Sequence, residues 1–311
     1  MAKIQIPDTL KADIPHTLLG RMMAATPVVM TVVATMLAGL ASSEMTKAQY
    51  DRSLAAQQQS KAGDQWSFFQ AKRLRSALQR NTLDLLQASN EVHPLDTANL
   101  TQAVAGSEAL TAKLTSPETQ TALELLQKGS LPTLSAPAPL PQEIKDAQHA
   151  IESLRPDPEV AAAVTKVTDD QLTAAILAGK ERADALDAAT KPINEVVDAI
   201  DTTLAQQPSS PAKRDFIAAR LRFAAVRYDT EARLNQAIAS LYEIQVRKNN
   251  LSAERHHQRS KRFFFGMLGA QMAVIISTFA IAARQRNLLW TLAAGAGVTA
   301  LIFAAYVYLY V

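Results

Sequence analysis

The chain has 311 residues, no cysteine and a formal net charge of +3. Without cysteine it cannot form disulfides, thiolate metal sites or thiol nucleophiles. Residues 44–262 hold 27 basic and 27 acidic side chains, so the excess positive charge lies outside that range and does not indicate nucleic-acid binding.

The first 21 residues form a polar lead. Leu10, Ile14 and Leu18 recur at a spacing of four. This spacing predicts an amphipathic helix in the bilayer interface, with a disordered terminus as the alternative.

Three segments, residues 22–43, 263–283 and 288–311, contain no Asp, Glu, Lys or Arg. Each reaches the length of about 20 apolar residues that a helix needs to cross a bilayer. We therefore predict three transmembrane helices. A signal peptide is the alternative for the first segment, because its apolar run ends in small residues.

Helical composition continues between the first and second apolar segments. Residues 44–90 lack proline, and residues 212–262 are also uninterrupted, so we predict one long helix leaving the membrane and one returning to it. Residues 91–211 form a helical insertion with a proline-rich linker at 131–141. The sequence thus predicts an all-α, three-transmembrane-helix protein with a long antiparallel, coiled-coil-like stalk.

Residues 62–78, AGDQWSFFQAKRLRSAL, carry one of only two tryptophans in the chain. If both stalk helices start at the same bilayer face, residues at equal distance from the membrane lie level. Trp66 is then level with Ser240 and Leu241, Phe69 with Ala237 and Ile238, and Leu78 with Tyr228. We interpret Trp66, Phe69, Leu74 and Leu78 as one side of a helix–helix core, with a ligand site as the alternative.

The polar residues of the same stretch fall into two groups. Lys72, Arg73 and Arg75 are predicted to form a solvated flank of this core. Asp64 and Gln65, beside Gly63, are not explained by a core, and they predict a polar contact or a helix irregularity at this point.

A basic cluster precedes three phenylalanines at the start of the second apolar segment. Such a cluster can bind anionic lipid headgroups, and an ordinary stop-transfer flank is the alternative. The predicted headgroup residues are Arg255, His256, His257, Arg259, Lys261 and Arg262. Adjacent residues on a helix point about 100° apart, so His256 and His257 are not expected to share a metal ion.

Small residues spaced by four occur in each apolar segment, a pattern that allows close helix packing in membranes. The predicted packing residues are Thr31, Thr35, Gly39, Gly269, Ala273, Ser277, Ala293 and Gly297. Gln271 is the amide in the middle of a span, and it is predicted to bond between helices. Trp290 and Tyr310 are expected at opposite interfaces.

The sequence lacks the common catalytic motifs. It has no phosphate-binding glycine loop, no HExxH and no GxSxG. No ionisable residue lies within the apolar segments, so coupled ion transport lacks its usual carrier. We therefore expect no enzyme activity, no catalytic residues, no cofactor and no metal.

Nine Lys and Arg side chains lie within 20 residues of the apolar segments on the side of residues 44–262, and five lie on the other side. The positive-inside rule therefore favours a cytoplasmic position for these residues.

Two stretches together resemble the bacterial family known as domain of unknown function 4337 (DUF4337). The first comprises Asp64, Gln65, Trp66, Phe68, Phe69, Gln70, Ala71 and Lys72, where Ser67 departs from the family pattern. The second is Arg255, His256 and His257. The resemblance covers the first apolar segment, residues 44–90 and residues 212–311, and leaves out residues 91–211. It implies a short membrane protein with a C-terminal hairpin and implies no activity.

These observations lead to one main hypothesis. The protein is expected to be a non-enzymatic bacterial inner-membrane scaffold. Its partners would be the bilayer and a second copy or another protein bound through the stalk. An accessory or pore-forming subunit of a homo-oligomeric channel is the alternative.

Overall fold

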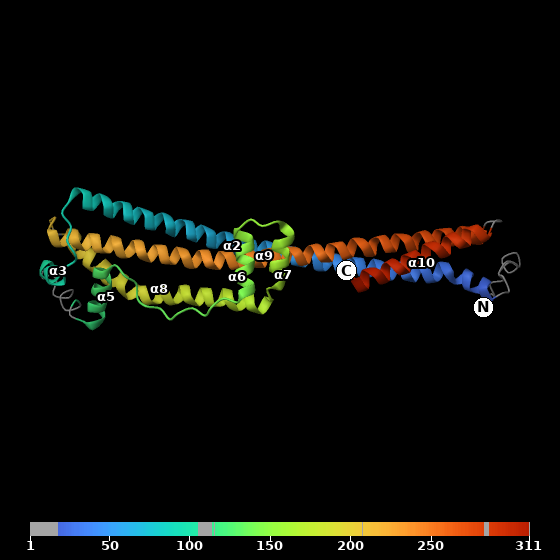
Figure 1. Ribbon diagram of the computed structural model, residues 1–311, viewed down its shortest axis with the longest axis horizontal. Coiled ribbons are helices and arrows are strands. Elements are labelled where there is room, and N and C mark those ends of the chain that lie inside the picture. Colours follow the sequence, from blue (N-terminus) through green and yellow to red (C-terminus); the bar gives the residue numbers. More distant parts are fainter. Residues whose placement is uncertain (1–17, 105–113, 115, 207, 283–285, 311) are drawn as a thin grey trace, which may run out of the picture. The chain divides into compact units, whose positions relative to one another are not determined.

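The structure is a computed structural model that describes residues 18–104, 114, 116–206, 208–282 and 286–310 (Figure 1). Within these ranges the regular secondary structure is helical and there is no strand, which confirms the predicted all-α class. Most of the polar lead, including Leu10 and Ile14, lies outside the described residues.

Two helices are far longer than the others. The helices are α2 (Leu18–Ser89), α3 (Thr97–Ala103), α5 (Pro117–Lys128), α6 (Gln142–Glu152), α7 (Asp157–Lys166), α8 (Asp169–Ala205), α9 (Pro211–Ala282) and α10 (Arg286–Tyr310). Each long helix joins a predicted transmembrane segment to a predicted stalk segment without a break. Three helices, α2, α9 and α10, contain stretches long and apolar enough to cross a membrane.

The chain divides into two compact units. Residues 1–55 and 249–311 form one, which we name the three-helix unit, and residues 56–248 form the other, the central unit. Each unit contains one part of α2 and one part of α9.

The three-helix unit is packed through small side chains. One cluster joins Met30 and Ala34 of α2 to Ala273 of α9 and Ala300 of α10. A Cβ added to Gly297 of α10 would lie 3.2 Å from the Sδ atom of Met30. Lipid tails are as apolar as leucine, so helices in a bilayer associate through close packing rather than through water exclusion.

The outer surface of the three-helix unit is also apolar. Large side chains on all three helices are more than one-third exposed, which suits contact with lipid tails. They include Val28, Met36, Phe279, Leu301 and Leu309.

The central unit has a conventional hydrophobic core. Leu100 of α3, Leu126 of α5, Ile200 of α8 and Phe216 of α9 are almost fully buried in one cluster. Side chains of α2 do not belong to this cluster. The core therefore joins α9 to α8 and to the shorter helices.

Local signals in the sequence define the short helices. Asp96 accepts a hydrogen bond from the Ala98 amide at the start of α3, and Thr168 forms a capping box with Gln171 at the start of α8. Side-chain caps of this kind satisfy amides that have no partner within the helix. Helix α5 ends at Gly129, which has φ 62°, and a Cβ there would lie 2.7 Å from Cδ of Arg222.

Helices α2 and α9 run antiparallel within the central unit. The Ser76 hydroxyl donates to the carbonyl oxygen of Ala225 at 2.9 Å. Because a serine side chain is short, this bond shows that Ser76 of α2 lies directly beside Ala225 of α9, which defines the register of the two helices. The predicted register placed Leu78 beside Tyr228, and hence residue 76 beside Thr230. That register is wrong by five residues along α9.

Alanine recurs at every seventh position on the packed side of α2. Its members are Ala34, Ala41, Ala48, Ala55 and Ala62, each at most 8% exposed. On α9, Ala225, Ala232 and Ala239 follow the same interval, Val246 takes the next position and Ala253 the one after it, and all of them are buried. A sevenfold repeat keeps one side of a helix on its partner, and alanine permits a close approach. This repeat is also readable in the sequence.

Candidate functional site

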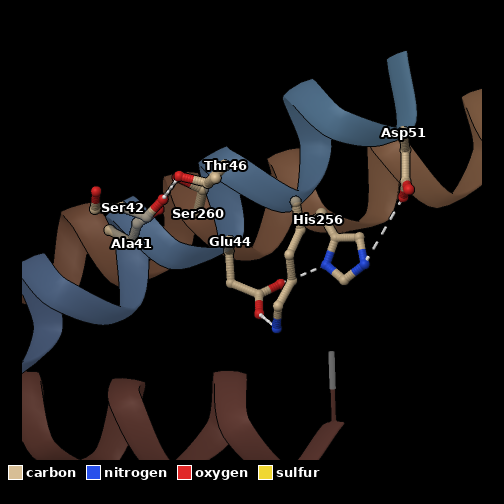
Figure 2. A network of polar contacts seen from close by, with 8 residues as sticks. Ala41, Ser42, Glu44, Thr46, Asp51, His256 and Ser260 are labelled. Atoms are coloured by element: carbon tan, nitrogen blue, oxygen red, sulfur yellow. Dashed lines mark hydrogen bonds and ion pairs between the residues drawn. The ribbon is translucent and has the colours of Figure 1, made fainter. Parts of the chain in front are cut away.

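A buried acid lies at the end of the first apolar segment, within the three-helix unit (Figure 2). Glu44 is only 8% exposed. Its Oε2 atom lies 2.6 Å from Nδ1 of His256, and its Oε1 atom accepts a hydrogen bond of 2.8 Å from Lys47. The other ring nitrogen of His256 is 4.0 Å from Oδ2 of Asp51. His256 therefore lies between two carboxyl groups of α2.

The local charges keep Glu44 ionised. Burial raises the pKa of this carboxyl, but hydrogen bonds from Lys47 and His256, together with their charges, lower it below its ordinary value. A buried carboxylate is tolerated only when such partners replace water. The cluster thus links α2 to α9 electrostatically where the charge-free segment ends.

A second contact supports this link. The hydroxyl of Ser260 donates to the carbonyl oxygen of Ala41 at 2.8 Å, and both residues are buried (Figure 2). Ser42 and Thr46 lie beside it on α2, where Thr46 donates to the Ser42 carbonyl oxygen at 3.0 Å. Short polar side chains thus tie α2 to α9 with little separation of the helices.

The two adjacent histidines have different surroundings. His256 contacts Glu44, whereas His257 lines a hollow together with Lys261 and Phe264. In the part of the chain that the structure describes, no group of three His, Asp or Glu side chains could hold a metal ion.

Polar contacts also join α2 to α9 in the central unit. Trp66 donates from Nε1 to Oε1 of Glu243 at 2.8 Å, and Lys72 forms an ion pair with Glu231. Arg73 pairs with Asp229, which Arg233 also contacts. We name these contacts, with the Ser76 bond, the polar seam. Lys72 is therefore more enclosed than the predicted solvated flank, whereas Arg73 pairs with Asp229 while its side chain stays 54% exposed.

Asp229 is the most enclosed acid of the polar seam. Burial raises its pKa, but the hydrogen bond from Arg73 and the charges of Arg233 and Arg73 lower it below the ordinary value. Asp229 is therefore charged at neutral pH, and the folded seam favours its ionised form.

Three cationic side chains contact the aromatic ring of Tyr228, next to Asp229. The ring centroid of Tyr228 lies 5.4 Å from Nζ of Lys72, 5.9 Å from Cζ of Arg75 and 4.7 Å from Cζ of Arg227. A cation over a ring face adds about 0.5–1 kcal/mol at exposed sites. Arg75 is exposed, as predicted, and it also contacts this aromatic face.

Residues 19–129 match the family model of the domain of unknown function DUF4337. The match agrees with the predicted resemblance over that part of the chain. It extends to residue 129, which corrects the expectation that residues 91–211 lie wholly outside the resemblance. Arg255, His256 and His257 lie beyond the matched residues. No curated protein and no solved structure matches the chain.

The DUF4337 motif residues have unequal surroundings. Trp66 is half-buried and stacks edge-on to Phe69 at 5.4 Å between centroids. Asp64 and Gln70 are exposed, whereas Oε1 of Gln65 is buried without a hydrogen-bond partner. Their predicted neighbours on α9, Ile238 and Leu241, are buried. Within the motif, Trp66 and Lys72 are the side chains that hold α9 through polar contacts.

The leucines of the DUF4337 stretch are not core residues. Leu74 is 62% exposed and Leu78 is 53% exposed. The buried position between them is Ser76. The prediction that both leucines lie in the α2–α9 core is therefore wrong, because the helix turns its polar residues toward the acids of α9.

The predicted transmembrane packing residues divide by helix. Ala273 and Ser277 of α9 are buried, as are Ala293 and Gly297 of α10, and a Cβ on Gly269 would lie 3.4 Å from Cβ of Ala300. The α9 and α10 residues therefore lie where their helices pack together.

The corresponding residues of α2 are exposed, and Thr31 and Thr35 line a hollow beside α9 rather than a packed contact. Thr31 and Thr35 are exposed and donate to backbone carbonyl oxygens of their own helix. Nothing lies within 4 Å of a Cβ on Gly39. Gln271 of α9 is also exposed, so it does not bond between helices as predicted. The packed face of α2 is the one that carries Ala34 and Ala41.

The remaining predicted residues lie at the ends of the apolar segments. Lys261 and Arg255 are exposed, while Arg259 and Arg262 are partly buried. Trp290 is partly buried, and the side chain of Tyr310 lies outside the described residues.

Proposed function

We propose that this protein is a non-enzymatic helical scaffold of the bacterial inner membrane, and that its central unit joins a second copy of the chain through α2. The three helices that are apolar enough to cross a membrane support the anchor. The Lys and Arg excess beside the apolar segments supports a cytoplasmic central unit.

The observation that carries the proposal is an exposed leucine face on α2. Leu74, Leu78 and Leu85 are 62%, 53% and 71% exposed. They are four and seven residues apart, so they lie along one side of the helix. We name this surface the leucine face. Contiguous apolar surface rimmed by polar residues is typical of sites that bind another protein.

The position of α2 explains why the face is open. In the central unit α9 lies between α2 and α8 (Figure 1), with α2 joined to α9 by the polar seam and α8 joined to α9 by the hydrophobic core. α9 is therefore covered on two sides, and α2 is an edge helix. Its side away from α9 carries the leucine face.

A second copy suits this face. A two-fold axis would bring the leucine face of one α2 onto the same face of another, and such self-complementary pairing is the commonest form of oligomer. The face is flanked by exposed polar residues, as expected of the rim of an interface.

Cysteine crosslinking tests the proposal on a clean background, because the chain has no cysteine. The full-length variant Leu78→Cys, in its native membrane, is expected to form a disulfide-linked dimer on mild oxidation. The variant Gln87→Cys is the matched control, since Gln87 is exposed on α2 but lies away from the leucine face. It is expected to stay monomeric under the same oxidation.

A second variant separates a dimer interface from accidental collision. Leu78→Glu combined with Leu85→Glu is expected to convert the dimer in mild detergent to a monomer while helix content is unchanged. An unaltered oligomer would overturn the proposal. Ion conductance by the purified protein in liposomes would instead favour a channel subunit.

A further inference from the structure

A hollow lies between α2 and α9 of the three-helix unit, beside the basic cluster. Its volume is about 530 Å³. Apolar side chains form most of its wall, and His257 and Lys261 stand at its polar end. The lining residues are Ala38, Ala41, Ser42, Met45, His257, Ser260, Lys261, Phe264, Phe265 and Met267.

A second hollow continues along the same two helices. It has a volume of about 470 Å³ and shares Ala38 and Met267 with the first. Its far end is lined by Ile275. From Lys261 to Ile275 a helix rises about 21 Å at 1.5 Å per residue, while half of a hydrocarbon core measures about 15 Å. The joined hollows, which we name the lipid groove, therefore extend over one leaflet and its headgroup region.

The polar end of the lipid groove has the chemistry of an anion site. His257 and Lys261 are four residues apart and so share one side of α9. Nδ1 of His257 is buried without a hydrogen-bond partner, and Lys261 is exposed, with no ion pair among the described residues. The Lys261 ammonium can donate to a phosphate oxygen, and the His257 ring lines the hollow beside it. The Ser260 hydroxyl is already used by the carbonyl oxygen of Ala41.

The nearby acids do not neutralise this end. Glu44 is occupied by Lys47 and His256, and Glu254 lies 4.0 Å from Arg52. Arg259 and Arg262 add positive charge on other sides of the same turns of α9. The local field therefore favours a bound anion.

The wall beyond the polar end suits a hydrocarbon chain. Phe264 and Phe265 are exposed at the mouth, a common position for aromatic residues at the membrane interface. Small side chains such as Ala38 leave the floor open. A transmembrane helix from a second copy is a poorer occupant, because residues 22–43, 263–283 and 288–311 contain no acid to meet Lys261.

We infer that the lipid groove binds one anionic phospholipid. The phosphate lies at His257 and Lys261, and one acyl chain runs along Ala38 and Met267 toward Ile275. This site belongs to the three-helix unit and is independent of the leucine face, so either proposal can fail without the other.

Native mass spectrometry of the full-length protein in detergent with added lipid tests the inference. Phosphatidylglycerol is expected to remain bound at one copy per chain, and phosphatidylcholine is expected to bind more weakly. Lys261→Gln should lower phosphatidylglycerol retention about fivefold, since one basic residue near a lipid surface contributes about that factor. Arg262→Gln is the matched control, because it removes the same charge from the next residue, which does not line the groove.

A second variant tests the acyl-chain part of the site. Ala38→Phe fills the region shared by the two hollows, and it is expected to reduce lipid retention while helix content and thermal unfolding stay close to those of the native protein. If inorganic phosphate alone competes fully with the lipid, the hydrocarbon part of the inference is wrong.

Other outcomes would overturn the inference entirely. Equal retention of phosphatidylcholine and phosphatidylglycerol would show ordinary lipid contact. Equal losses in Lys261→Gln and Arg262→Gln would show a diffuse charge effect. A disulfide-linked dimer formed by Ala38→Cys would show that a second copy fills the groove.

Discussion

Helix α2 packs on α9 in both units, but it does so with different chemistry. In the three-helix unit its packed side carries Met30, Ala34 and Leu37 in apolar clusters. In the central unit its packed side carries Trp66 and Lys72, among other polar residues, which contact acids of α9. The buried positions of α2 thus recur every seven residues in both units, but they belong to an apolar contact in one unit and to a largely polar contact in the other.

The difference is the one expected for a three-helix unit that spans a bilayer and a central unit that lies in water. In a bilayer the helices gain nothing by hiding apolar groups from lipid, so small side chains and close packing hold them. In water an apolar core gives the larger gain, and in the central unit that core lies on the α8 side of α9. The polar seam is partly exposed, and exposed ion pairs contribute about 0–1 kcal/mol each. We therefore expect α2 to be the less firmly attached neighbour of α9 there.

The largest effect is expected in the core of the central unit. Phe216 is fully buried, and Phe216→Ala should lower the free energy of unfolding by about 3–5 kcal/mol through loss of burial and a remaining cavity. Denaturant unfolding of the full-length protein, followed by Trp66 fluorescence, would measure it. Leu177→Ala is the exposed control, because Leu177 of α8 is 55% exposed and lies outside the leucine face, and a much smaller change is expected there. Equal costs at the two positions would contradict the assignment of the core.

A smaller effect is expected where α10 meets α2. Gly297→Leu would push against Met30, because a Cβ alone already lies 3.2 Å from its Sδ atom. Overpacking of this kind costs about 1–3 kcal/mol. Gly295→Leu is the control, since nothing lies within 4 Å of a Cβ there. Thermal unfolding in detergent should separate the two variants, and a lower midpoint for Gly295→Leu would reverse the predicted packing.

The polar seam is expected to depend on pH. Asp229→Asn should lower stability at pH 7 by about 1–3 kcal/mol, as expected for lost hydrogen bonds to a charged group. The folded pKa of Asp229 lies below its ordinary value, so its contribution is present above that ordinary value and is lost as the pH falls through the folded pKa. The difference between native protein and variant should therefore shrink in acid. A difference independent of pH would mean that the carboxylate charge is not what stabilises the seam.

The smallest effect is expected at the tryptophan. Trp66→Phe keeps an aromatic ring but removes the hydrogen bond to Glu243, at a cost of about 1 kcal/mol. A double-mutant cycle with Glu243→Ala, which removes the acceptor, would measure the coupling between the two side chains. Strictly additive effects would show that the hydrogen bond contributes nothing beyond packing.

The sequence predicted the elements better than their contacts. Charge-free segments and helical composition indicated α2, α9 and α10 because membrane length and charge exclusion are local properties. The alanine repeat was also readable, since its interval of seven lies within one helix. The acids that meet Lys72 and Arg73 lie more than 150 residues away, so no local pattern linked them.

The candidate sites also show that local features could be predicted from the sequence, whereas contacts between distant residues could not. Arg255 to Arg262 predicted a lipid-headgroup region from composition alone, whereas the lipid groove depends on where Ala38 lies against α9. His256 and His257 were expected to point in different directions, and only the folded chain identifies Glu44 as the partner of the first.

By itself the sequence determined the all-α class, the three apolar helices and the family match, because hydropathy, charge and proline placement act within single segments. The tertiary structure decided which side of α2 packs. Leu74 and Leu78 form one apolar stripe and Thr31, Thr35 and Gly39 one small-residue stripe, yet both stripes are exposed. On the other side of α2, small alanines allow a closer approach to α9, and polar side chains pair with the acids of α9. These contacts can be identified only in the folded chain, where the two helices lie side by side.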